Sequence, residues 1–143
     1  MTIHLLKLCV GADTIDDLAA WRDICLKEAK KKKRPPLMPH VTRMHPRRES
    51  EILDGGSLYW VIKGFISARQ RVERLEPVIG ADGIERCAIL LDPEIIPTQA
   101  QARRPFQGWR YLKVEDAPGD VGKGAATDMP PQLHAELSEL GLL

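Results

Sequence analysis

The sequence lacks the features that mark several common classes of protein. Aromatic residues make up only 5% of its 143 residues, and no apolar run approaches the roughly 20 residues of a membrane span. The N-terminus is apolar, but it is short, carries His4 and Lys7, and has no small-residue cleavage site. It therefore predicts a first β-strand rather than a signal peptide. We expect a protein without membrane segments.

Cysteine is also scarce, which limits redox and metal chemistry. Cys9, Cys25 and Cys87 are widely spaced and flanked by apolar residues, as is typical of buried free thiols in a reducing compartment. His40 and His45 have the spacing of half a zinc site, but no cysteine pair accompanies them. We therefore expect a cytoplasmic protein with no metal and no cofactor.

The sequence has neither a Gly-rich phosphate loop ending in GK[ST] nor a G-x-S-x-G nucleophile motif. It predicts no catalytic residue and leaves open whether the protein is an enzyme. One alternative is a small hydrolytic or nucleotide-directed enzyme in which His45 and a carboxylate act as acid and base. A second alternative is a protein-interaction module that uses residues 118–132.

The length of the chain and the glycines and prolines that separate its predicted elements indicate a single α+β domain over residues 1–143. Thr14 and Asp17 form a capping-box pattern before a helix expected at 15–33, which Pro35 must end. About five or six strands should form a mixed or antiparallel meander, curled toward an open barrel. The expected strands cover residues 2–10, 40–44, 57–63, 65–79, 86–91 and 109–114.

The remaining segments are expected outside this sheet. Residues 46–53 should form a short helix or turn, and 97–108 should be a loop. Residues 65–79 also contain good helix formers, but glycines on both sides favour a strand. Residues 118–132, rich in Gly and Pro, predict a flexible loop or arm. A helix carrying Leu133, Leu137 and Leu140 should follow it and pack outside the sheet.

Charge is unevenly distributed along the chain, although the net charge is only +1. Residues 22–74 hold 14 Lys and Arg against 6 Asp and Glu, a balance of +8. Residues 75–143 hold 6 against 11, a balance of −5. Such asymmetry predicts a surface that faces a polyanion. The basic run at 30–34 has a second interpretation, since cations stabilise the C-terminus of a helix.

The segment 43–48, RMHPRR, concentrates guanidinium groups suited to phosphate. Aromatic residues on neighbouring predicted strands could stack a base if they are exposed. We therefore predict a module that binds nucleic acid, most simply RNA. The opposite interpretation is that the aromatics are core residues and the arginines pair with nearby carboxylates. The predicted contact residues are Arg43, His45, Arg47, Arg48, Trp60, Lys63, Arg69, Arg71, Arg104, Trp109 and Arg110.

Four long motifs resemble the bacterial family called domain of unknown function 1489. They are HLLKLCVG (4–11), RMHPRR (43–48), DGGSLYWVIKG (54–64) and RRPFQGWRYL (103–112), so the resemblance spans essentially the whole chain. It implies a stand-alone bacterial protein and carries over no catalytic residue. The order of a Thr-Arg element, a short helix, a Gly turn and a meander is also similar to the PUA-like group, including ASCH and EVE domains. That similarity implies a small barrel with flanking helices, often RNA-binding.

Overall fold

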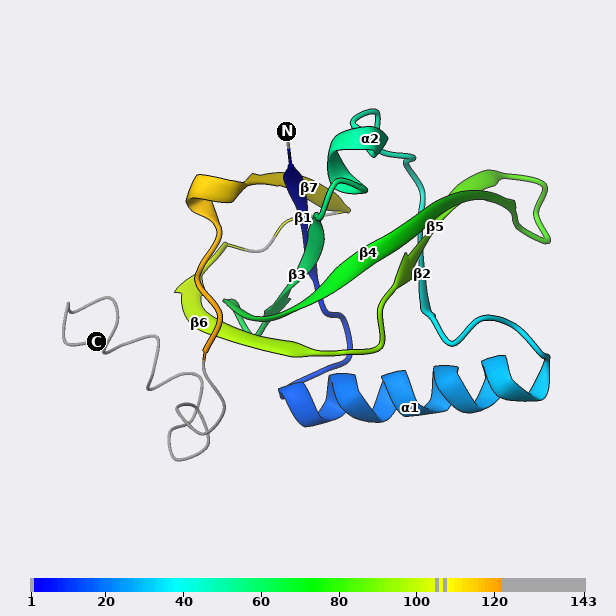
Figure 1. Ribbon diagram of the computed structural model, residues 1–143, viewed down its shortest axis with the longest axis horizontal. Helices are drawn as coiled ribbons and strands as arrows, with labels where there is room; N and C mark the ends of the chain where they lie inside the picture. Colours follow the sequence, from blue (N-terminus) through cyan, green and yellow to red (C-terminus); the bar gives the residue numbers. More distant parts are fainter. Residues whose placement is uncertain (1, 105, 107, 122–143) are drawn as a thin grey trace, which may run out of the picture.

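The computed structural model describes residues 2–104, 106 and 108–121. In this part of the chain a seven-stranded open mixed sheet is combined with few helices (Figure 1). The elements are β1 (Ile3–Leu8), α1 (Ile15–Lys31), β2 (Met38–Thr42), α2 (Glu49–Ile52), β3 (Ser57–Ile62), β4 (Phe65–Ile79), β5 (Glu85–Leu91), β6 (Ile96–Ala102), β7 (Trp109–Lys113) and the 3-10 turn η1 (Val114–Asp116).

The helix α1 follows the capping-box prediction. The Thr14 side chain accepts a hydrogen bond from the Asp17 backbone N–H, and the Asp17 carboxylate accepts from that of Thr14. The helix ends at Lys31, two residues before the expected boundary, and Lys33 has a left-handed φ of 54°. The buried Leu18 attaches α1 to one face of the sheet. In Figure 1 the helix lies along the lower edge of the molecule.

The long strand β4 organises the sheet. Its first half pairs with β3 on one edge and β6 on the other, and its second half pairs with β5. The strand predicted at 65–79 is therefore confirmed, as is the antiparallel β3–β4–β5 meander. The strand order β2-β5-β4-β3-β1-β7 places β1 between β3, to which it is parallel, and β7, to which it is antiparallel. The sequence allowed a mixed sheet but did not predict which strands would be parallel.

The prediction that 97–108 is entirely a loop is wrong. Residues Ile96–Ala102 form β6, which pairs with β4 through contacts such as Phe65 opposite Ala102. The segment IPTQAQA lacks aromatic residues and carries Pro97 near its start, so its own composition does not favour a strand. Pairing with a distant strand overrides this weak local preference, and Pro97 is tolerated at the beginning of a strand.

Apolar side chains pack on both faces of the sheet. The larger cluster lies between the sheet and α1 and includes the fully buried Trp60 and Leu58. The Trp60 indole N–H donates to the Gln70 side-chain oxygen at 2.9 Å, so its polar atom is satisfied inside the core. The smaller cluster, on the opposite face, consists of Leu6, Tyr59, Val61, Ile66 and Leu112 with partly buried neighbours.

The chain after η1 turns back across this second face. The backbone N–H of Gln99 in β6 donates to the carbonyl of Gly119 at 2.8 Å, and that of Val121 donates to Pro97 at 2.9 Å. Residues 118–121 of the predicted arm thus lie against β6, while the rest of it and the predicted C-terminal helix lie outside the described residues. No helix in the described part of the chain is long and apolar enough to cross a membrane.

Candidate anion-binding surface

The basic segment 43–48 is attached to the sheet by the aromatic residues of β7. The Tyr111 hydroxyl accepts hydrogen bonds from the backbone N–H groups of Arg47 at 3.0 Å and Arg48 at 3.2 Å. The Trp109 indole N–H donates to the Met44 carbonyl at 3.0 Å. Trp109 is therefore partly buried and already used to hold this loop.

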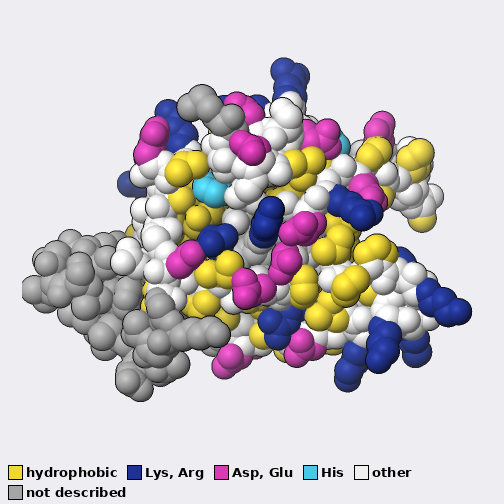
Figure 2. Space-filling view, in the orientation of Figure 1, with side chains coloured by type: hydrophobic (Ala, Val, Ile, Leu, Met, Phe, Trp, Pro, Cys, Tyr) yellow, Lys and Arg dark blue, Asp and Glu magenta, His cyan; other side chains and the backbone are white. Residues whose placement is uncertain are grey.

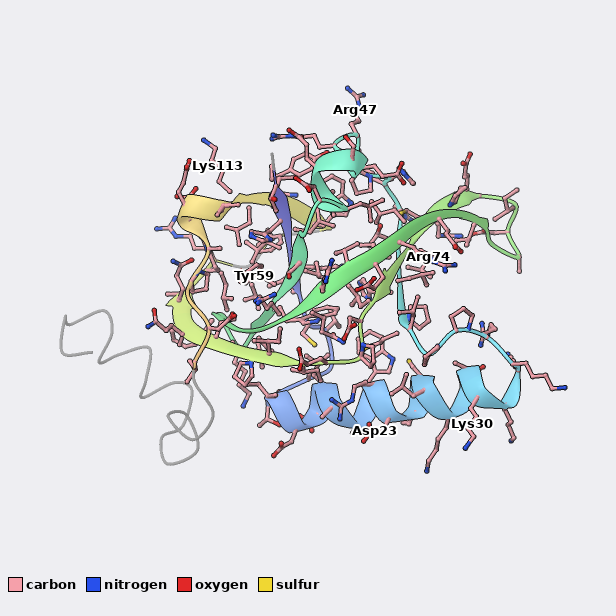
Figure 3. All side chains as sticks on the ribbon, in the orientation of Figure 1. Asp23, Lys30, Arg47, Tyr59, Arg74 and Lys113 are labelled. Atoms are coloured by element: carbon pink, nitrogen blue, oxygen red, sulfur yellow. The ribbon has the colours of Figure 1, made fainter. Side chains whose placement is uncertain are left out.

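The side chains of this segment are not equivalent. Arg48 forms an ion pair with Glu51 and lies over the Tyr111 ring at 5.5 Å. Arg43 and Arg47 are exposed and form no ion pair with another described residue. Figure 3 shows Arg47 projecting from the same end of the molecule as Lys113. Arg43 and Arg47 remain available to a ligand.

His45 has the carboxylate partner that the enzyme alternative requires, but the pair is open to solvent. Its Nε2 lies 3.2 Å from the Glu49 carboxylate, and the two side chains are 40% and 44% exposed. Neither residue lines the pocket of about 670 Å³ on the second face or the pockets beside α1 and β4. The arrangement does not create the closed acid–base site that the enzyme alternative requires.

Trp60 is buried, and Arg69 and Arg71 of β4 both have carboxylate partners. Trp60 is 0% exposed, so its ring is out of reach of a base. Arg69 and Arg71 line the same pocket beside β4, as expected for one strand face. However, Arg69 donates two hydrogen bonds of 2.8 Å to the Asp120 carboxylate. The Arg71 Nε lies 3.7 Å from the Glu73 Oε1. Asp120 has a lowered pKa, chiefly because of the Arg69 hydrogen bond.

The basic run at the end of α1 lies apart from β7, at the opposite end of the molecule (Figure 1). Figure 2 shows its Lys and Arg side chains gathered there, whereas basic and acidic side chains alternate over β4. The Glu28 Oε1 lies 2.9 Å from the Lys32 Nζ and 3.9 Å from the Arg34 Nη2. Lys30 and Lys31 occupy the last turn, where they complement the helix dipole.

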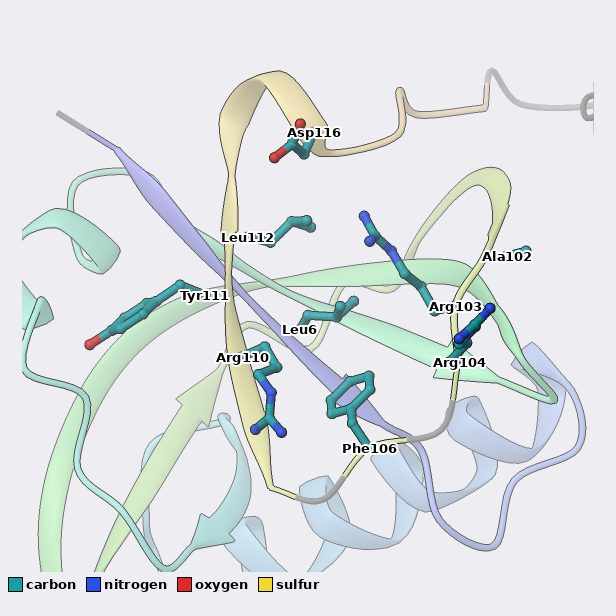
Figure 4. Close-up of a pocket in the computed structure, with 9 residues that line it drawn as sticks. All are labelled: Leu6, Ala102, Arg103, Arg104, Phe106, Arg110, Tyr111, Leu112 and Asp116. Carbon is teal, nitrogen blue, oxygen red and sulfur yellow. The ribbon is translucent and has the colours of Figure 1, made fainter.

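A pocket of about 670 Å³ on the second face brings other arginines together (Figure 4). Its apolar floor includes Leu6 and Leu112. We call it the arginine pocket, and its lining residues are Leu6, Ala102, Arg103, Arg104, Phe106, Arg110, Tyr111, Leu112 and Asp116. Arg110 and Leu112 reach it because alternate residues of β7 point to the same face of the sheet.

Arg110 and Arg103 are held in the pocket by different contacts. Arg110 lies over the Phe106 ring at 5.4 Å. Arg103 donates to the Gln101 side-chain oxygen at 2.8 Å, and its Nε is buried with no partner among the described residues. The Arg103 backbone N–H donates to the Gly64 carbonyl at 2.7 Å, which places the exposed Lys63 turn beside the pocket.

Arg104 and Arg110 are among the contact residues predicted from the sequence, whereas Arg103 and Phe106 are not. The signal was present in the motif RRPFQGWR, where arginines flank an aromatic residue. Its meaning depends on knowing that β6 ends at Ala102 and β7 begins at Trp109, so that Arg103, Arg104 and Phe106 lie at the pocket on the second face. In the described residues no group of three or more His, Cys, Asp or Glu side chains is arranged to hold a metal ion.

Comparison with known families agrees with the motif resemblance. The model of a protein family of unknown function, DUF1489, matches residues 5–143. The chain therefore belongs to this family, as its motifs predicted. No curated protein and no solved structure matches the chain.

Proposed function

We propose that this protein binds single-stranded RNA through the arginine pocket and the basic residues around it. The observation that carries the proposal is the convergence of Arg103, Arg104 and Arg110 on one cavity beside Phe106. Guanidinium groups bind phosphate through paired N–H donors, and an aromatic ring or a guanidinium plane can stack an unpaired base.

The buried Nε of Arg103 gives the pocket a specific reason to bind an anion. A buried polar group without a partner costs about 1–3 kcal/mol, and more when it is charged. Because this Nε has almost no exposed surface, a phosphate oxygen would accept its hydrogen bond, and remove the cost, only after the Arg103 side chain turns toward the pocket. Neither Arg103 nor Arg104 forms an ion pair with a described carboxylate, whereas Arg69 already holds Asp120.

A polymer fits the surroundings better than an isolated small anion does. The Lys63 turn adjoins the pocket through Arg103, and Lys113 is an exposed residue of β7. Arg47 is held beside the same strand by Tyr111. Because β7 is at the end of the strand order, a flexible backbone can pass around it and contact several of these cations.

The PUA-like architecture and the cytoplasmic location belong to the same proposal. The first is supported by the mixed sheet whose two parts share β4, with α1 packed on one face. It remains an analogy at the level of fold. The second is supported by the three free cysteines, since free thiols persist in a reducing compartment.

The test is a fluorescence-anisotropy titration with a labelled single-stranded RNA at several salt concentrations. For single strands log K falls with log salt at a slope of about −0.7 per neutralised phosphate, so three arginine contacts give about −2. Arg104→Ala should weaken binding and flatten that slope by about 0.7. Arg74→Ala is the matched control, because Arg74 is exposed, lies 3.9 Å from Glu76 and does not line the arginine pocket.

Two results would contradict the proposal: no binding at low salt, where attraction is strongest, or equal behaviour of Arg104→Ala and Arg74→Ala. Equal affinity for single-stranded DNA would exclude RNA as the specific partner. Asp120→Asn gives an independent check. It removes the carboxylate charge that neutralises Arg69, so it should increase affinity and steepen the salt dependence rather than weaken binding.

A further inference from the structure

The arginine pocket has two chemically different sides, and the second has no role in simple phosphate binding. Arg103 and Arg104 come from the chain after β6, whereas Asp116 comes from η1, after β7. Figure 4 shows Asp116 above the Leu6 and Leu112 side chains, with the Arg103 guanidinium reaching toward the same space. A carboxylate repels a phosphate, so a pocket for phosphate alone would gain nothing from it.

Asp116 is held in place by its backbone, which leaves its side chain for a ligand. Its carbonyl accepts a hydrogen bond from the Gln101 side chain at 3.4 Å, and η1 is closed by the Ala117 N–H donating to Val114. No ion pair joins the Asp116 carboxylate to Arg103 or Arg104. Because an ionised carboxylate only accepts hydrogen bonds, the group opposite it must offer N–H or O–H donors.

One nucleotide meets all of these requirements. Ligand pockets have volumes of about 300–1,000 Å³, and the present 670 Å³ admits a single nucleotide. A phosphate would lie at Arg103 and Arg104, and the base would extend over the apolar floor toward Asp116. Among the common bases, guanine presents two adjacent donors, N1–H and the N2 amino group, which match the two carboxylate oxygens. Uracil presents one N–H between two carbonyls, which the carboxylate would repel.

We propose that the arginine pocket recognises one unpaired guanine nucleotide, with Arg103 and Arg104 on its phosphate and Asp116 on its Watson–Crick edge. The proposal rests on RNA binding as the function and specifies which nucleotide the pocket selects. Recognition of a base by hydrogen bonds to its edge is the usual way in which proteins read single-stranded RNA.

The experiment is direct calorimetric titration of the full chain with mononucleotides, together with their competition against labelled RNA. The probes are GMP, inosine monophosphate, UMP, guanosine and inorganic phosphate. We expect GMP to bind at least about tenfold more tightly than inosine monophosphate, which lacks the N2 amino group, because a hydrogen bond to a charged group contributes that much. Guanosine and phosphate alone should each bind at least about tenfold more weakly than GMP.

Variants assign the two ends of the ligand. Asp116→Asn should remove the preference for GMP over inosine monophosphate while leaving UMP affinity unchanged or higher. Arg104→Ala should weaken all of the nucleotides together. Glu115→Gln is the matched control, since it removes the neighbouring charge of η1 from a residue that does not line the pocket, and it should keep the GMP preference.

The outcomes separate this proposal from the broader one. If RNA binds and Arg104→Ala weakens it, but no mononucleotide competes, the guanine pocket is wrong and RNA binding stands. The same conclusion follows if inorganic phosphate competes as strongly as GMP does, or if Asp116→Asn keeps the preference for GMP over inosine monophosphate. If GMP binds with the expected pattern but RNA does not bind, the guanine-nucleotide proposal stands and the RNA-binding proposal is wrong. If nothing binds, both proposals are wrong.

Discussion

Replacing His40 tests how strongly this fold depends on a neutral, partly buried histidine. The ring packs edge-on against Trp60, with ring centroids 5.1 Å apart, and against Trp21 at 5.8 Å. Its Nε2 is buried without a partner among the described residues. Burial, with a smaller contribution from the Lys7 charge, lowers the pKa of His40 from 6.5 to about 4.

The sign and the size of the effect follow from this pKa. A lowered pKa means that the unfolded chain takes up the proton first as the pH falls. The stability from neutral His40 is therefore fully present above pH 6.5 and is lost as the pH falls toward about 4. One pKa unit corresponds to about 1.4 kcal/mol, so a change from 6.5 to about 4 corresponds to about 3 kcal/mol.

The assay is urea unfolding of the wild type and His40→Phe between about pH 7.5 and pH 4, with the free energy of unfolding compared at each pH. Phenylalanine keeps the aromatic contacts and cannot titrate. The wild type should lose about 3 kcal/mol more than His40→Phe over this range. The exposed His45→Gln is the control and should follow the wild type. His4, whose pKa burial also lowers, is present in all three proteins. Parallel pH curves for the wild type and His40→Phe would refute the reasoning.

Two further changes test the packing. Gly56→Ala should destabilise the protein by about 3 kcal/mol or more, because its Cβ would overlap the backbone carbonyls of Ile3 and Ile52, which have little freedom to move; an unchanged denaturation midpoint would contradict this. Burial raises the pKa of the Cys9 and Cys87 thiols to about 11. Near pH 8 each thiol should therefore react with a disulfide reagent at least about a hundredfold more slowly than free cysteine. Rapid labelling of either thiol in the folded protein would show that its environment is misassigned.

Local signals in the sequence were sufficient to predict much of the secondary structure. The Thr14 capping box and Pro35 bounded α1 to within two residues, because helix ends depend on hydrogen bonds between near neighbours. Gly64 and the turn at 80–83 delimited β4 although its residues also suit a helix. By contrast, the parallel β1–β3 pair and the strand β6 depend on partners far along the chain. No local pattern specifies such pairings.

The same limit applied to the binding surface. The sequence shows where arginines are frequent along the chain, but which of them are available to a ligand is decided by long-range contacts. Arg69 is neutralised by Asp120, which is 51 residues away. Arg104 and Arg110 meet only because β6 and β7 bring them to one pocket. Trp60 carried the expected aromatic signal, yet a central strand buries it completely.

The position of β1 has a consequence for how this protein is made. As the ribosome releases the chain from its N-terminus, β1 can gain β3 once residues up to Ile62 have emerged, but its other edge stays unpaired until β7 at Trp109–Lys113 is available. At about 5–20 residues per second, the intervening synthesis takes several seconds. An unpaired strand edge is a template for aggregation. Nascent or truncated chains that end before Trp109 should therefore be the forms that depend most on chaperones.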